Sequence, residues 1–331
     1  MLLLNLGGPD SIQAVRPFLY NLFSDRHIIK LGPSFLQKPV AYLISFLRAR
    51  KAEGMYRLIS GKSPILDITA AQAGELEKAL NSELRTPNSE PSFKIYFGMR
   101  YWRPFIGNTV SQMYQDGIRH IIAMSLYPHY SVATSGSAIL GFEKAVKGFP
   151  VEYAIISSWF DHPLYVDALV DVIKEGMESF KINSELPTPN SELNVPILFS
   201  AHSLPMSIVN SGDPYVEHIK ATIREVEKRV DAKWYLSFQS RTGPVEWLGP
   251  STDEMLRELA GKGVKKLLVV PISFVSDHVE TLYEIDILYK NLAKRLDIEL
   301  VRAEALNTHP LFIKALEAVV VKKVQEIGWT E

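Results

Sequence analysis

Residues 266–295 read KLLVVPISFVSDHVETLYEIDILYKNLAKR and carry the pattern that decides the fold. The run Leu267–Val270 is continuously apolar, which is typical of a strand covered on both faces, and we predict a strand at Lys266–Val270. Pro271 opens a loop, and Val279–Arg295 then has the spacing of a helix. A strand followed by a helix is the unit from which α/β folds are built.

The same unit recurs along the chain. The other candidate strands are Leu2–Leu6, Lys94–Gly98, His120–Ser125, Glu152–Ser157, Pro196–Ser200, Trp234–Phe238 and Glu299–Ala303. Candidate helices between them include Ser11–Leu22, Ile68–Asn81, Pro163–Phe180, Asp213–Val230, Thr252–Gly261 and Pro310–Ile327. Because four strands precede residue 158 and four follow it, we predict two similar doubly wound, Rossmann-like α/β domains. Their sheets are expected to be parallel, with a ligand-binding cleft between the domains.

The domain boundaries follow from this alternation. We expect an N-terminal α/β domain at 1–158 and a C-terminal α/β domain at 159–308. The remaining helix, at 309–331, is expected to pack back on the first domain. With 331 residues, 47% of them hydrophobic, the chain is long enough to bury sizeable cores.

Charge and cysteine content exclude several classes of function. The formal net charge is −1, so the basic footprint typical of a nucleic-acid-binding protein is missing. The chain has no cysteine, which excludes disulfides, thiolate nucleophiles, and zinc or iron–sulfur clusters held by cysteine. A metal would have to be bound by His, Asp, Glu, Tyr or backbone oxygens. The longest apolar run, Val40–Leu47, is shorter than the roughly 18 residues of a membrane span, and we expect a cytoplasmic protein.

One short segment occurs twice. Asn81–Glu90 reads NSELRTPNSE and Asn183–Glu192 reads NSELPTPNSE, identical at nine of ten positions. Ten residues are too few for a structural repeat unit. Both copies are polar and follow a predicted helix, so we interpret them as surface-loop insertions; a paired docking motif is the alternative.

A histidine is expected at the end of a strand in the second half. The segment 196–215 reads PILFSAHSLPMSIVNSGDPY, in which the strand ends near His202 and Asp213-Pro214 opens a helix. The carboxyl end of a parallel strand is where α/β proteins place functional groups. The histidine could equally be a structural residue of the core.

Acidic residues cluster after the strand at Lys266–Val270. Asp277, His278, Glu280 and Glu284 follow it closely, and the two glutamates are four residues apart on one helix face. A solvated helix face is one explanation for such a pair. The other is a path for cations or protons, because neighbouring carboxylates raise each other's pKa.

Aromatic and basic residues follow several other predicted strands. The segments are YFGMRYWRP at 96–104, YPHYS at 127–131 and QSRTGPVEWLGP at 239–250. A tryptophan such as Trp247 in a loop rich in Gly and Pro either fills the core or stacks on a flat ligand. Together these strand ends indicate a large, flat, anionic ligand.

Residues 31–51, LGPSFLQKPVAYLISFLRARK, combine an apolar stretch with a basic end. The apolar side chains could form the core-facing side of a helix. Alternatively they form an exposed lip that touches a membrane surface, with Arg48, Arg50 and Lys51 toward anionic headgroups.

Seven motifs in order resemble the ferrochelatase family, over almost the whole chain. They are LLLNLGGP at 2–9, SGKSPI at 60–65, RYWRP at 100–104, YPHYS at 127–131, FSAHSLP with GDPY at 199–215, QSRTGPVEWLGP at 239–250 and SDHVETLYEID at 276–286. The resemblance implies a chelatase-like fold and an enzyme, a lyase that inserts Fe²⁺ into protoporphyrin IX to form protohaem in the last step of haem biosynthesis. Iron is then a substrate, and no cofactor is permanently bound.

The resemblance also assigns residues. It implies that His202 and Glu280 are catalytic and bind the metal, and that Glu284, His278 and Asp277 lie along the path for protons or metal. It implies that the porphyrin is bound in the cleft by a further set, namely Arg100, Tyr101, Tyr127, Ser131, Trp247 and Leu6. The bacterial type without an iron–sulfur cluster fits a chain that has no cysteine, and residues 31–51 match the family's hydrophobic lip.

Other functions remain open at this stage. One is a ferrochelatase that acts on coproporphyrin, and another is a cobalt chelatase for a different tetrapyrrole, against which the WLGP loop argues. A non-enzymatic haem or tetrapyrrole carrier would need an axial iron ligand but no row of carboxylates. We expect a monomer that binds porphyrin and ferrous iron but no nucleic acid, with residues 31–51 as the place for peripheral contact with the inner face of the membrane.

Overall fold

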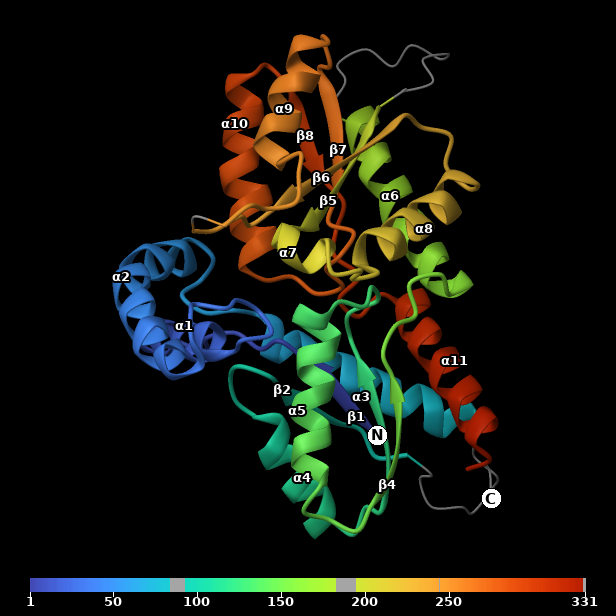
Figure 1. Ribbon diagram of the computed structural model, residues 1–331. Coiled ribbons are helices and arrows are strands. Elements are labelled where there is room, and N and C mark those ends of the chain that lie inside the picture. Colours follow the sequence, from blue (N-terminus) through green and yellow to red (C-terminus); the bar gives the residue numbers. More distant parts are fainter. Residues whose placement is uncertain (84–92, 183–194, 244, 330–331) are drawn as a thin grey trace. The chain divides into compact units, whose positions relative to one another are not determined.

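The computed structural model describes residues 1–83, 93–182, 195–243 and 245–329. The chain divides into two compact units, one formed by Met1–His162 with Asn307–Glu331 and the other by Pro163–Leu306. Each unit holds one four-stranded parallel sheet with helices on both faces (Figure 1). The α/β fold with parallel, doubly wound sheets is therefore confirmed. The boundaries at 158 and 308 stay a prediction about independently folding domains.

The first unit is built on the strand order β2-β1-β3-β4. The strands are β1 (Leu2–Asn5), β2 (Tyr96–Met99), β3 (His120–Ser125) and β4 (Glu152–Ile156). One face is covered by α4 (Ile106–Gln115) and α5 (Ser137–Val146), and the other by α3 (Ile65–Glu83) and α11 (Pro310–Ile327). Leu2 and Leu4 pack with Val110 and Phe142 in a buried cluster, and Leu3 is buried as well, which explains why β1 is apolar from Leu2 to Leu4.

The second unit repeats this topology, with the strand order β6-β5-β7-β8. Its strands are β5 (Ile197–His202), β6 (Trp234–Gln239), β7 (Lys266–Val270) and β8 (Glu299–Arg302). One face is covered by α9 (Thr252–Gly261), the π-helix η4 (Glu280–Tyr289) and α10 (Lys290–Arg295), and the other by α6 (Pro163–Ile182) and α8 (Tyr215–Glu227). Gly176 lets α6 approach the sheet, because a Cβ atom there would lie 2.6 Å from Leu268 Cδ1.

Several predicted elements differ from the structure at their ends. The expected helix Val279–Arg295 is a π-helix followed by a short α-helix, and the strand expected to end at Ser200 continues to His202. The Asp213 side chain accepts a hydrogen bond from the Tyr215 N–H as expected, but α8 begins only at Tyr215. The candidate helix Ser11–Leu22 is present as η1 (Ile12–Ala14) continued by α1 (Val15–Ser24). Short turns of helix not predicted from the sequence are η2 (Ser34–Leu36), η3 (Val132–Gly136) and α7 (Met206–Val209).

The duplicated segment lies mostly outside the described residues. Of the first copy, only Asn81–Glu83 is described, and these residues continue α3 instead of forming a loop. The second copy, at 183–192, lies wholly outside the described residues, so the loop interpretation stays a prediction there.

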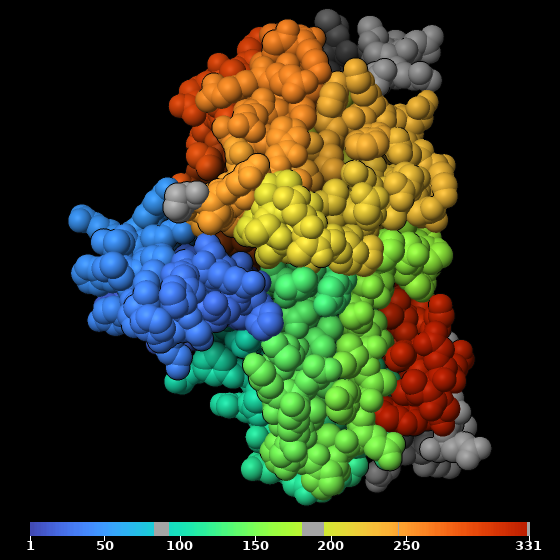
Figure 2. All heavy atoms as spheres, in the orientation of Figure 1, coloured from blue at the N-terminus to red at the C-terminus, as the bar shows by residue number. Residues whose placement is uncertain are grey.

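Residues 31–51 are mainly helical, with small side chains buried and large apolar side chains exposed. They lie mainly in α2 (Gln37–Leu58), which packs on α1 (Val15–Ser24) through the small side chains of Ala41, Ser45 and Ala49. The large apolar side chains point outward, and the most exposed are Phe35, Tyr42, Leu43, Phe46 and Leu47. A core-facing role for these side chains is therefore wrong. Figure 2 shows the atoms of α1 and α2, in blue, at the surface.

None of the helices in the described part of the chain is both long enough and apolar enough to cross a membrane.

Candidate functional site

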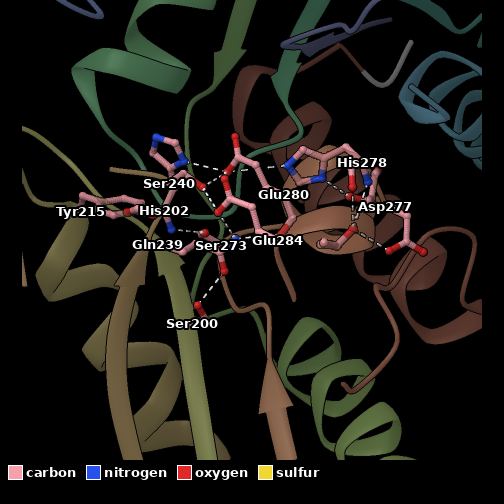
Figure 3. Close-up of polar contacts among 12 residues, drawn as sticks. Ser200, His202, Tyr215, Gln239, Ser240, Ser273, Asp277, His278, Glu280 and Glu284 are labelled. Carbon is pink, nitrogen blue, oxygen red and sulfur yellow. Dashed lines mark hydrogen bonds and ion pairs between the residues drawn. The ribbon is translucent and has the colours of Figure 1, made fainter. Parts of the chain in front are cut away.

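Three neighbouring strands of the second unit end at one edge of the sheet and bring polar side chains together there. His202 ends β5 and is paired in register with Gln239, which ends β6. Ser240 follows Gln239, and the loop after β7 leads into η4, whose first residue is Glu280. Because the strands are parallel, their carboxyl ends meet, as expected for a site in an α/β fold. Figure 3 shows these side chains converging.

The closest contact in this group joins His202 and Glu280. His202 Nδ1 lies 2.7 Å from Glu280 Oε2, and the two side chains are 33% and 17% exposed. The carboxylate can only accept, so Nδ1 carries the hydrogen and the second nitrogen, Nε2, holds the lone pair of the neutral ring. In Figure 3 that second nitrogen is turned away from Glu280. Nε2 of His202 is therefore placed to accept a proton or to bind a metal ion.

The histidine is held from its backbone as well. The Ser273 hydroxyl accepts a hydrogen bond from the His202 N–H at 2.9 Å, and the Tyr215 hydroxyl donates to the His202 carbonyl at 3.1 Å. The Phe274 ring stands edge-on to the imidazole with the ring centres 6.3 Å apart. The imidazole thus has a fixed orientation before any ligand binds.

Glu284 joins the pair through Ser240. The Ser240 hydroxyl lies 3.1 Å from Glu280 Oε2 and 2.7 Å from Glu284 Oε2, and it can donate its single hydrogen to only one of them at a time. Ser240 has a left-handed backbone conformation with φ of 66°. This conformation is unfavourable for residues other than glycine and is typical of functional sites. The interpretation of Glu280 and Glu284 as a solvated helix face is therefore wrong, since both point into this polar cluster.

Gln239 fixes the backbone of the π-helix. Its Nε2 group donates to the Glu280 carbonyl at 2.8 Å and to Glu284 Oε2 at 3.2 Å, while its Oε1 accepts from Ser200 at 2.6 Å. The hydroxyl of Ser200 thereby sets which end of the amide faces the carboxylates. A helix of this type is rare in proteins and frequently lies at functional sites.

Burial and mutual charge separate the pKa values of the three groups. Burial alone would lower the pKa of His202, but the adjacent Glu280 carboxylate outweighs it and raises that pKa. Burial acts to raise the pKa of Glu280, but His202 overrides it, and the net shift is downward. Burial, and then repulsion by Glu280, raise the pKa of Glu284 to about 7. The site therefore contains an ionised carboxylate beside a carboxyl group that holds its proton up to neutral pH.

Glu284→Gln is expected to raise the melting temperature relative to the parent, and more so at about pH 8 than at about pH 5. The folded pKa of Glu284 lies above its ordinary value of 4.5, so its contribution to stability is complete below that value and is lost as the pH rises through about 7. Glutamine keeps the acceptor oxygen without the charge. Melting curves followed by circular dichroism across this pH range check the expectation, with Glu258→Gln on exposed α9 as control. The same temperature difference at all pH values would contradict it.

His278 and Asp277 are close to this group but turned differently. His278 Nδ1 lies 2.9 Å from the Ser276 carbonyl, so it carries the hydrogen, and Nε2 faces Glu280 Oε2 at 3.9 Å. Asp277 instead accepts from Thr281 at 2.8 Å and pairs with Arg302 at 3.1 Å. Asp277 thus lies on the other side of His278 from Glu280 (Figure 3). Its position does not bring it to His202.

The first unit has its own group of polar residues at the carboxyl edge of its sheet. Arg100 and Tyr101 follow β2, and Arg100 Nη2 and the Tyr101 hydroxyl donate to Asp25 Oδ2 at 2.7 and 2.8 Å. Ser137 donates to the same oxygen at 2.5 Å. Asp25 is buried, which acts to raise its pKa, but the hydrogen bonds from Ser137 and the others hold that pKa below its usual range. Tyr101 is itself 2% exposed, so its hydroxyl is committed to Asp25.

The other residues assigned to the porphyrin are spread over both units. Leu6 is half-buried after β1, Tyr127 is half-buried after β3, and Ser131 is buried and caps η3 by accepting from the Ala133 N–H. All three lie at the carboxyl edge of the first unit's sheet. Trp247 belongs to the second unit, where its indole N–H donates to the Thr242 carbonyl at 3.0 Å.

The chain is similar to known proteins over nearly all of its length. The family model described as Ferrochelatase matches residues 1–324. The chain belongs to the ferrochelatase family. It is 49% identical to a ferrochelatase of Geotalea uraniireducens over 98% of this chain and 97% of that one. It is also 44% identical to a ferrochelatase of a Synechocystis species over 98% of this chain and 82% of that one.

A solved structure supports the fold of this ferrochelatase family member. SirB from Bacillus subtilis with Fe³⁺ superposes with a TM-score of 0.51, at 13% sequence identity, over 76% of this chain and 88% of that one. At such low identity the likeness concerns the fold alone. It agrees with the two parallel sheets and with the prediction of a chelatase-like architecture.

Sequence reasoning missed several members of the site. Gln239 and Ser240 were visible only as part of a loop after a strand, and Ser273 and Tyr215 carried no signal of their own. The available signal was positional, because Gln239-Ser240 stands at the same strand end as His202 does one strand earlier. Extending the strand-end argument to every polar residue there would have found Gln239 and Ser240.

Proposed function

We propose that this chain inserts Fe²⁺ into protoporphyrin IX and forms protohaem, with the release of two protons. Membership of the ferrochelatase family supports the reaction class. The observation that carries the proposal is the pairing of His202 Nδ1 with Glu280 Oε2 at 2.7 Å at the carboxyl edge of the second sheet. This pair gives a chain without cysteine both a base and hard oxygen ligands for a divalent ion.

The first task of the reaction is to remove protons from two pyrrole nitrogens. Nε2 of His202 accepts a pyrrole proton, and the ionised Glu280 carboxylate stabilises the imidazolium that forms. The proton then leaves through the polar cluster, in which Ser240 lies between Glu280 and Glu284. Two pyrrole protons leave and one Fe²⁺ enters, so charge is conserved.

The second task is to deliver iron. Glu280 has a second oxygen, Oε1, beyond the one that faces His202, and Glu284 lies one helical turn further on. Carboxylate oxygens and imidazole nitrogen suit Fe²⁺ and also Zn²⁺ and Co²⁺, so these ions should compete. In this proposal Glu280 delivers the metal while His202 serves as proton acceptor, and His278 and Glu284 line the approach.

The porphyrin itself is assigned to residues of both sheets. Arg100 is proposed to pair with a propionate, because its side chain is still 27% exposed while bound to Asp25. Tyr127, Ser131, Leu6 and Trp247 are proposed to contact the ring, and the buried Tyr101 supports Arg100 through Asp25.

The proposal is tested by mixing the protein with free-base protoporphyrin IX and Fe²⁺ under anaerobic conditions and following the absorbance spectrum. Formation of several haems per chain is expected. Tight binding of haem or porphyrin without insertion above the uncatalysed rate would contradict the proposal and favour a carrier. Coproporphyrin in parallel assays identifies the preferred ring.

We also propose that the protein is cytoplasmic and monomeric and contacts the inner face of the membrane through residues 31–51. The exposed apolar side chains of α2 and the nearby Arg50 and Lys51 support this contact. Changing Phe46 and Leu47 together to serine is expected to weaken binding to vesicles of anionic phospholipid by about tenfold or more. Sedimentation with vesicles measures it, and Leu58→Ser, at the other end of α2, is the control. Equal binding by all three proteins would contradict it.

A further inference from the structure

Arg302 ends strand β8 and directs its guanidinium group at the π-helix. Its Nε and Nη2 atoms donate to the two carboxylate oxygens of Asp286, both at 2.9 Å. Its Nη1 atom lies 3.1 Å from Asp277 Oδ1. The arginine side chain is only 11% exposed, so these are partly buried ion pairs in which geometry matters. A two-point contact of this kind fixes the orientation of the carboxylate as well as its position.

The two aspartates lie on either side of the two glutamates. Asp277 precedes Glu280 by three residues, and Asp286 follows Glu284 by two. A residue two positions further along a helix points to roughly the opposite side, so Arg302 grips the face of η4 turned away from Ser240. One arginine therefore holds both ends of the segment that carries the site's carboxylates.

Arg302, which we call the anchor of η4, has its backbone held firmly in the sheet. Arg302 is paired in register with Val269 of β7, and the Ala303 N–H donates to the Val269 carbonyl at 2.9 Å. Strand β7 is the strand that leads into η4. The guanidinium thus ties the π-helix back to the same sheet edge from which His202 projects.

The first turn of η4 depends on this anchor. The residue before η4, Val279, supplies no capping side chain. Instead Asp277 accepts from the Thr281 hydroxyl at 2.8 Å, and Thr281 in turn accepts from the His278 N–H at 3.0 Å. Arg302 holds Asp277 in the position that this arrangement needs. Burial acts to lower the pKa of Arg302, but Asp286 and Asp277 raise it, so the anchor stays charged.

We propose that Arg302 is a positioning residue for metal insertion, which holds η4 in the π conformation that turns Glu280 and Glu284 toward His202. The inference rests on the function proposed above and adds to it a residue that touches neither metal nor porphyrin. It also gives Asp277 a positioning role in place of a direct part in the path for protons or metal.

The test compares Arg302→Met, Arg302→Lys and Asp286→Asn with the parent. Glu299→Gln is the matched control, because it removes the ion pair with Lys266 at the other end of β8. With Zn²⁺ as the varied substrate, kcat/KM is expected to fall about 10- to 100-fold in Arg302→Met, the effect of a displaced catalytic group. Arg302→Lys should recover part of it, since lysine keeps the charge but not the two-point contact. Rates are normalised to the protein that binds porphyrin, and porphyrin affinity should not change.

A second measurement does not depend on turnover. Co²⁺ is titrated into each protein without porphyrin, and its absorbance bands report the ligands. Arg302→Met should weaken Co²⁺ binding at least about tenfold, while Glu299→Gln should not. If Arg302→Met loses Co²⁺ binding while the parent protein does not insert metal, the proposed function is refuted but the positioning role of Arg302 is supported. Parent-like kcat/KM and Co²⁺ binding in Arg302→Met, or a loss only in proportion to lost porphyrin binding, would overturn the anchor. If Arg302→Met does not fold, the lysine and asparagine variants decide on the same criteria.

Discussion

Replacing His202 with alanine is expected to lower kcat for metal insertion by about 100- to 10,000-fold, the range associated with loss of a general base. Glu280 lies 2.7 Å from His202 Nδ1 and thereby orients the lone pair of the imidazole. Among the described residues, no other group at this sheet edge has its lone pair oriented by a carboxylate. Porphyrin binding should persist, because the residues proposed to bind the ring lie elsewhere. Initial rates with Zn²⁺ and protoporphyrin, together with fluorescence titration of the porphyrin, measure both quantities.

The control for this variant is His120→Ala, since the His120 side chain is 61% exposed at the start of β3. It should keep the parent's rate and melting temperature. A His202→Ala protein that retains turnover within a few-fold of the control would remove the histidine from the mechanism. A loss of porphyrin binding equal to the loss of rate would show that the histidine acts on substrate affinity.

Glu280→Gln is expected to lower kcat by about 100- to 1,000-fold. The amide keeps the size of the side chain but can no longer stabilise the imidazolium or bind a cation well. The same change should lower the pKa of His202, because in the parent Glu280 outweighs burial and raises it. Titration of the imidazole by NMR, beside the rate, separates the two effects.

The comparison protein for Glu280→Gln is Glu258→Gln, which removes a surface pair with Lys262 on α9. Surface pairs of this kind contribute little, so its rate and His202 titration should match the parent. An unchanged pKa of His202 in Glu280→Gln would contradict the close pairing of the two groups.

Much of the architecture could be predicted from the sequence because most of the strands contain a short, continuous apolar run. His120–Ser125, Lys266–Val270, Thr252–Gly261 and Pro310–Ile327 were predicted at the residues where the structure has them. The pattern works here because strands covered on both faces need uninterrupted apolar runs. The position of His202 at a strand end followed from the same argument.

The conformation around Glu280 could not be predicted in this way. A spacing of four residues puts Glu280 and Glu284 on one face in either an α- or a π-helix, so the pattern does not distinguish them. The π-helix is held by Gln239 at the end of β6 and by Arg302 at the end of β8. These contacts join residues that are far apart in the sequence. The left-handed backbone conformation of Ser240 could not be predicted either, because a serine in the sequence does not indicate it.

The interpretation of residues 31–51 illustrates a second limit. Apolar side chains at helical spacing normally mark the buried face of a helix, and a core-facing side was one of the two interpretations of this stretch. In α2 the small residues are the buried ones, because they let the helix approach α1 closely, and the large ones are exposed. The pattern predicted the helix but not which of its faces is buried.

The most direct test of the His202–Glu280 pair is a single-turnover experiment. Protoporphyrin IX is first bound to the protein, the complex is mixed rapidly with Zn²⁺, and the spectrum is followed in the parent and in the double variant His202→Ala, Glu280→Gln. If the pair carries the chemistry, the parent converts its bound porphyrin quickly, and the double variant converts it no faster than free porphyrin. Conversion by the double variant within about tenfold of the parent, or about 1.4 kcal/mol in barrier, would contradict the account.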